Sequence, residues 1–120
     1  MQWDEQLHDK GTLAVIRLRG EVDLQHSPKL REILQAKIAL RLPALLLDFS
    51  EVKYIDSSGL ATLVEYFQHA RAYSGRLALV GMTDRVKSVF DLVRLNEIFE
   101  FYPSVAEACT RLNSTAKTNP

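Results

Sequence analysis

Apolar positions along the chain recur with two different periods, and these periods predict where helices and strands lie. Ser27 followed by Pro28 is typical of a helix start, because a serine can cap the first turn and proline suits the first helical position. The apolar residues that follow share one helix face: Leu30, Ile33, Leu34 and Ile38. We expect this helix to end near Leu42, because the residue before Pro43 avoids the α region.

Apolar runs without a helical period predict the strands. The segment 44–49, ALLLDF, is apolar on both faces, as expected of a strand that is buried on both sides. The segment 75–82, GRLALVGM, is a second such run, and the alternating segment 97–102, EIFEFY, predicts a last strand. Near the N-terminus, the turn signal at 9–11, Asp-Lys-Gly, separates two alternating segments and predicts an antiparallel hairpin.

Three further helices are expected after the first buried strand. Their apolar faces consist of Leu60, Leu63, Val64 and Phe67; of Val86, Val89, Phe90 and Val93; and of Val105, Ala108, Cys109 and Leu112. Thr83 or Asp84 is expected to cap the third helix of the chain. Ser104, followed three residues later by Glu107, has the spacing of a capping box for the fourth.

The resulting element order is β-β-α-β-α-β-α-β-α. Strands that alternate with helices need crossover connections, so we expect an α/β fold with a mixed, mostly parallel sheet. About five strands, including the N-terminal antiparallel hairpin, would form this sheet, with about four helices packed around it. We expect one domain over residues 1–112 and a flexible tail over 113–120, because the ending NSTAKTNP is small and polar.

The amino-acid composition argues against nucleic-acid binding, membrane insertion, an intrachain disulfide and a metal site. Lys and Arg balance Asp and Glu at 15 each and form no run, so direct nucleic-acid binding is not expected. No apolar run approaches the ~18 residues needed to cross a bilayer, and the charged N-terminus is not a signal peptide, so we expect no membrane insertion and a cytoplasmic location. The single cysteine, Cys109, allows no intrachain disulfide, and the spacing of His8, His26 and His69 predicts no metal site.

The turn before the second helix contains more polar residues than a turn needs. It reads Asp56-Ser57-Ser58-Gly59. Asp56 or Ser57 can cap the helix and contribute about 1 kcal/mol, which leaves the second hydroxyl without a structural reason. Gly59 is unfavourable in a first turn by up to ~1 kcal/mol relative to alanine, but it would open access to the neighbouring hydroxyl. Spacing alone leaves open whether this turn is a helix cap or a chemical site.

A second polar loop is expected beside this turn. In a parallel sheet, the loops that leave the carboxyl ends of the strands gather along one edge. The polar loops 21–27 and 50–59 both lead into helix N-termini. We therefore expect Asp23 to lie close to Asp56 and to the two serines.

These segments resemble a known family. LLLDFSEVKYIDSSGLATLV, with GEVDL upstream and LVGMTDRVKSVFDLVRLNEIFEFYPSVAEA downstream, is similar to the anti-sigma factor antagonists of the STAS class over residues 15–112. The resemblance implies the family fold, a mixed sheet surrounded by helices. It also implies that the serine directly before the glycine, Ser58, is phosphorylated. The partner-binding positions that it implies are Asp23, Asp56, Ser57, Ser58 and Gly59.

The resemblance further implies how such a chain would act. In the family, the unphosphorylated protein binds an anti-sigma factor that is often itself a serine kinase, and a sigma factor is thereby released. The kinase phosphorylates the serine with its own ATP and Mg²⁺, and a serine phosphatase reverses the modification. The resemblance thus implies a binding protein without enzyme activity and without a cofactor of its own. It leaves the oligomeric state open.

Other functions stay open beside this one. The chain could be a STAS adaptor subunit of a membrane transport complex, such as an ABC-type lipid or anion transporter, or a phosphoswitch in another partner-switching pathway. A serine hydrolase could use Ser58 as the nucleophile with His26 and Asp23, although the turn is not G-x-S-x-G.

Overall fold

The described residues form a single mixed sheet. The computed structural model describes residues 1–117, and side-chain surroundings as far as Leu112. The strands lie in the order β1-β2-β3-β4-β5. Their bounds are Gln2–His8, Leu13–Val22, Ala44–Ile55, Arg76–Val80 and Glu100–Tyr102. β1 is antiparallel to β2 and all other neighbours are parallel, which confirms the predicted mixed sheet and its N-terminal hairpin.

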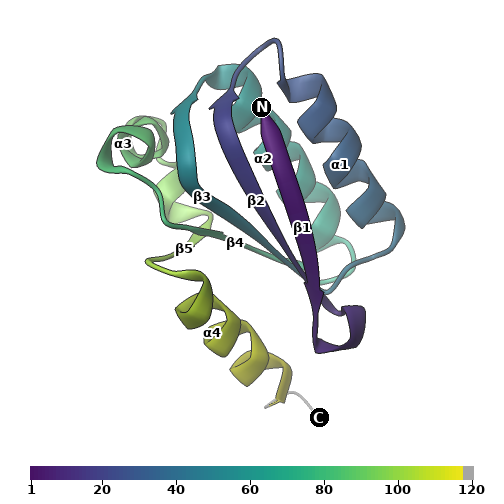
Figure 1. The fold of residues 1–120 in the computed structure, drawn as a ribbon. Helices are drawn as coiled ribbons and strands as arrows, with labels where there is room; N and C mark the ends of the chain where they lie inside the picture. Colours follow the sequence, from purple (N-terminus) through teal and green to yellow (C-terminus); the bar gives the residue numbers. More distant parts are fainter. Residues whose placement is uncertain (118–120) are drawn as a thin grey trace.

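Four α-helices pack around this sheet within residues 1–117. They are α1 (Ser27–Ala39), α2 (Ser57–Arg71), α3 (Asp84–Leu92) and α4 (Val105–Lys117), and two 3-10 turns, η1 (Asp9–Gly11) and η2 (Leu95–Glu97), complete the order. α1 and α2 lie side by side on one face, and α4 lies on the other (Figure 1). The expected number and order of helices are confirmed.

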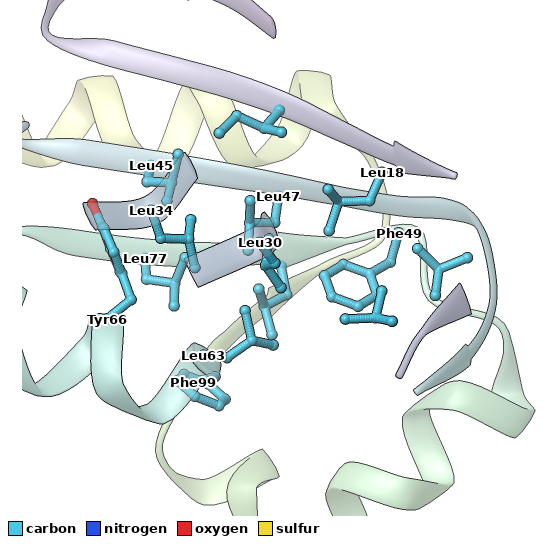
Figure 2. Packing of buried hydrophobic residues seen from close by; sticks show 14 of the residues in the cluster. Leu18, Leu30, Leu34, Leu45, Leu47, Phe49, Leu63, Tyr66, Leu77 and Phe99 are labelled. Atoms are coloured by element: carbon cyan, nitrogen blue, oxygen red, sulfur yellow. The ribbon is translucent and has the colours of Figure 1, made fainter. Parts of the chain in front are cut away.

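β3 is the central buried strand of the molecule. Leu45, Leu46 and Leu47 are all fully buried. Because side chains alternate along a strand, Leu45 and Leu47 join the large core under α1 and α2 (Figure 2), whereas Leu46 joins the smaller core under α4. This confirms the prediction from the ALLLDF run.

Phe90 fixes α3 to the sheet. It is fully buried and makes edge-to-face contacts with Phe49, Phe99 and Phe101, at ring-centroid distances of 6.3, 6.1 and 5.6 Å. Val93, which was expected on the same inward face, is 55% exposed. That prediction was wrong because α3 ends at Leu92, so the helical spacing no longer applies one residue later.

Four boundaries differ from the sequence-based expectations. The last strand, expected over 97–102, begins only at Glu100, because residues 95–97 form the 3-10 turn η2. β3 continues to Ile55, so the first part of the expected loop 50–59 is strand that still pairs with β2. α1 ends at Ala39, before the expected limit, and Arg41 then adopts a left-handed φ of 51°. α4 extends to Lys117 and so includes part of the expected tail 113–120, of which 118–120 lie outside the described residues.

An ion pair between a buried lysine and a more exposed glutamate ties β1 to α1. Lys37 is 9% exposed, and its Nζ donates to Glu5 Oε2 at 2.7 Å. We expect Glu5→Ala to lower the free energy of unfolding by about 1–3 kcal/mol, because the buried ammonium would lose its acceptor. Urea denaturation measures the loss. Glu32→Ala is the matched control, since Glu32 pairs with Lys29 at the surface and its removal should change stability by less than about 0.5 kcal/mol. Equal effects of the two variants would contradict the prediction.

Candidate functional site

Asp56 is the N-cap of α2. Its backbone is extended, with φ −117° and ψ −173°, and its Oδ1 accepts hydrogen bonds from the N–H groups of Ser58 at 2.9 Å and Gly59 at 3.2 Å. Two donors of the first turn, which would otherwise lack partners, are thereby satisfied. Of the two caps that the sequence allowed, the structure selects Asp56.

The same carboxylate joins the two polar loops. Asp56 Oδ2 accepts a hydrogen bond from the N–H of Leu24 at 3.1 Å, and the Asp56 N–H donates to the Val22 carbonyl at 3.3 Å. The loop after β2 is therefore bonded directly to the start of α2. The expected proximity of the two loops is confirmed, and Asp23 is the residue directly before Leu24.

The two serines differ in exposure. Ser57 is exposed and Ser58 is half-buried. Among the residues that the structure describes, neither hydroxyl makes a hydrogen bond, whereas the Ser58 carbonyl accepts one from Thr62 Oγ1 at 3.0 Å. Because α2 begins at Ser57, both serines belong to its first turn, where the helix dipole favours negative charge.

Gly59 has a packing role that the sequence did not indicate. An added Cβ would lie 2.5 Å from the Val22 carbonyl oxygen and 2.8 Å from Ile55 Cγ1. Only a residue without a side chain lets the start of α2 pack this closely against the ends of β2 and β3. The structure therefore buries Gly59 beneath the turn.

We expect Gly59→Ala to lower the free energy of unfolding by about 1–3 kcal/mol, because the clash with a backbone oxygen outweighs alanine's helix preference of ~1 kcal/mol. Chemical denaturation measures this. Ser57→Ala, at an exposed position in the same turn, is the control and should change stability by less than about 0.5 kcal/mol. A Gly59→Ala variant as stable as the parent would contradict this prediction and would show that the ends of β2 and β3 can shift to accommodate a Cβ.

Asp23 binds the histidine of its own loop. Its Oδ1 accepts a hydrogen bond from the His26 N–H at 3.1 Å and lies 2.7 Å from His26 Nδ1. Burial raises the pKa of Asp23, but the hydrogen bonds from the His26 ring and backbone outweigh it, so the pKa is lower than that of an ordinary aspartate. Asp23 is therefore ionised at neutral pH.

The residues considered for a serine hydrolase do not form a triad in this structure. Asp23 and His26 are paired, but the Ser58 hydroxyl makes no hydrogen bond to His26 within residues 1–117. The arrangement supplies two carboxyl groups and two hydroxyls without hydrogen bonds among the described residues, which suits binding and modification of a serine.

The part of the chain that the structure describes contains neither a cluster suited to a metal ion nor a helix suited to a membrane. Across residues 1–117, no group of three or more His, Cys, Asp or Glu side chains could hold a metal ion. In the same part of the chain, none of the helices combines the length and apolar character that crossing a membrane requires.

Comparison with known proteins places this fold and turn in a family. Residues 6–108 match the family model of the STAS domain. The anti-sigma-B factor antagonist of Listeria monocytogenes is 34% identical over 85 residues, which cover 71% of this chain and 75% of that protein.

Solved structures share the same architecture. The crystal structure of an anti-sigma factor antagonist from Mycobacterium paratuberculosis has a TM-score of 0.81 at 25% identity, covering 93% of this chain and 95% of that one. The anti-sigma factor antagonist SpoIIAA in its unphosphorylated form has a TM-score of 0.75 at 20% identity, covering 93% and 98%, a likeness that concerns the fold alone. With a match over residues 6–108, and with five strands and four α-helices in residues 1–117, this chain belongs to the STAS domain family.

Proposed function

We propose that this chain is an anti-sigma factor antagonist that acts by partner switching. In its unphosphorylated state it binds an anti-sigma factor that is also a serine kinase, and a sigma factor is released. Phosphorylation of Ser58 by that kinase ends the binding. The main support is the Asp-Ser-Ser-Gly turn at the start of α2, in a chain that is 34% identical to a protein named anti-sigma-B factor antagonist.

The geometry around Ser58 supports a role as phosphoacceptor. Its hydroxyl makes no hydrogen bond among the described residues, so phosphorylation would break none of the contacts that hold the turn. The Asp56 carboxylate holds the backbone of the turn through hydrogen bonds from the N–H groups of Ser58 and Gly59. Ser57 is the more exposed of the two serines, so the choice of Ser58 rests on its position directly before Gly59.

The proposed partner-binding surface consists of Asp23, Asp56, Ser57, Ser58 and the turn at Gly59. Its two carboxylates, those of Asp23 and Asp56, come from two loops that are joined by the hydrogen bond from the Leu24 N–H to Asp56 Oδ2. The partner kinase would bind ATP and Mg²⁺, and a serine phosphatase would regenerate the unmodified chain. This chain then needs no cofactor, no contact with nucleic acid and no enzyme activity of its own, and it would act in the cytoplasm.

Phosphorylation in vitro tests the site. The purified chain is incubated with the cognate anti-sigma factor kinase, ATP and Mg²⁺, and modified residues are located by mass spectrometry. We expect one phosphate on the parent chain and on Ser57→Ala, and none on Ser58→Ala. Phosphate found only on Ser57, or on neither serine, would refute the proposed site.

A pull-down from native cells tests the pathway. Under the proposed function, the tagged chain recovers an anti-sigma factor kinase. Recovery of a transporter ATPase would favour the transport alternative instead, and recovery of a kinase of another signalling pathway would favour a different phosphoswitch.

A further inference from the structure

The loop after β2 exposes a leucine on a fixed backbone. Leu24 is 72% exposed. Its N–H donates to Asp56 Oδ2 at 3.1 Å, and its carbonyl accepts from Ser27 Oγ at 3.4 Å. The Asp23 carbonyl also accepts from the N–H groups of His26 and Ser27, at 3.1 and 2.8 Å. These hydrogen bonds therefore position the Leu24 backbone before any partner binds.

The fold itself does not explain this leucine. Leu24 belongs to neither of the two core clusters. Turns favour Gly, Pro, Asn, Asp and Ser, each for a backbone reason that a leucine side chain does not supply. A single exposed leucine is ordinary on a protein surface, and Leu92 on α3, at 83% exposed, is an example. Exposure alone therefore assigns no role to either residue.

Leu24 differs from Leu92 in its attachment to the Ser58 turn. One carboxylate, that of Asp56, accepts from the Leu24 N–H through Oδ2 and from the Ser58 N–H through Oδ1. Only the Asp56 carboxylate thus lies between the backbone N–H of Leu24 and that of Ser58. A protein that covers Ser58 over the usual ~800 Å² per partner would cover Leu24 as well.

We propose that Leu24 is the apolar anchor of the surface around Ser58, and that it inserts into an apolar pocket of the anti-sigma factor kinase. This inference rests on the proposed function and extends it to a residue that selects the partner. The other side chains of this surface are polar, whereas interfaces gain most of their binding energy from a few well-buried side chains. Because the Leu24 backbone is already fixed, burying the side chain costs little loop ordering.

Binding measurements with the kinase recovered in the pull-down test this proposal. Isothermal titration, with the purified kinase and without ATP, compares the parent chain with Leu24→Ala, Leu24→Met and the matched control Leu92→Ala. We expect Leu24→Ala to weaken binding about tenfold or more, which corresponds to about 1.4 kcal/mol or more. Leu24→Met should stay within about threefold of the parent, because methionine fills a similar apolar volume. Leu92→Ala should bind like the parent.

The result also separates this inference from the proposed function. The loss in Leu24→Ala should persist as salt is raised, because an apolar contact is not screened. If the parent chain binds the kinase and Leu24→Ala binds equally well, the anchor is refuted and the proposed function stands. A loss of similar size in Leu92→Ala would also refute it. If the parent chain binds no anti-sigma factor kinase, the proposed function fails and the inference fails with it.

Discussion

Ser58→Glu is expected to weaken binding of the anti-sigma factor kinase by about a hundredfold or more and to leave the fold intact. Phosphoserine adds about −1.5 to −2 charges at pH 7, and glutamate reproduces part of that charge. The Ser58 N–H lies 2.9 Å from Asp56 Oδ1, so the added charge would lie next to an existing carboxylate. Burying an unpaired anion there should cost several kcal/mol, and each 1.4 kcal/mol is about tenfold in affinity.

The fold should tolerate the same charge. Ser58 is only half-buried, and negative charge at a helix N-terminus is favourable by about 0.3–2 kcal/mol. Repulsion from Asp56 opposes this gain, so the two effects should largely cancel in the free energy of unfolding. Circular dichroism and thermal unfolding should therefore give nearly the same spectrum and midpoint for Ser58→Glu as for the parent chain.

Two matched variants show whether charge at this position is the cause. Ser58→Ala removes the hydroxyl without adding charge, so it should bind the kinase like the parent and stay bound after ATP is added. Ser57→Glu places the same charge one residue earlier, at an exposed position, and should weaken binding less. Titration calorimetry compares all three. A Ser58→Glu affinity within about tenfold of the parent would refute the electrostatic switch.

The fold was predictable because its signals are local. Helical spacing, the buried ALLLDF run and the Asp-Lys-Gly turn each depend on neighbouring residues, and the elements that they predict were confirmed, with Val93, beyond the end of α3, as the exception on the helix faces. The local pattern predicts a loop over 50–55, because most of these residues are polar and exposed. In the structure this segment is the end of β3, and the side chains of Val52 and Ile55 are buried. Pairing with β2, which the local sequence does not encode, decides that this segment is strand.

The site was predictable in its residues but not in its connections. Asp56 was an expected cap, yet its bond to the Leu24 N–H joins positions 32 residues apart and depends on the folded sheet edge. Its place before the hydroxyl predicts that Gly59 opens access, whereas the 2.5 Å that would separate an added Cβ from the Val22 oxygen gives Gly59 a packing role. Both features arise where α2 meets the strand ends, which sequence spacing does not describe.

Phe90→Ala is expected to lower the free energy of unfolding by about 3–5 kcal/mol, the largest stability effect among the variants considered. The ring is fully buried and is surrounded by Phe49, Phe99 and Phe101. Its removal leaves a cavity that is bounded by three aromatic rings, one from β3 and two from the stretch 99–101 at β5, so the site has little freedom to collapse. A domain of this size is stable by about 5–15 kcal/mol, so the variant should retain a folded but marginal structure.

Urea denaturation of Phe90→Ala, with Leu92→Ala beside it, measures this effect. Leu92 lies on the same helix at 83% exposed, so its truncation to alanine should change stability by less than about 0.5 kcal/mol. A loss confined to Phe90→Ala, at an unchanged denaturant slope, would locate the stability in the aromatic cluster that attaches α3 to the sheet. If Phe90→Ala lost less than about 2 kcal/mol, the three surrounding rings would have to repack into the vacated space, and the cluster would be more adaptable than its edge-to-face geometry implies.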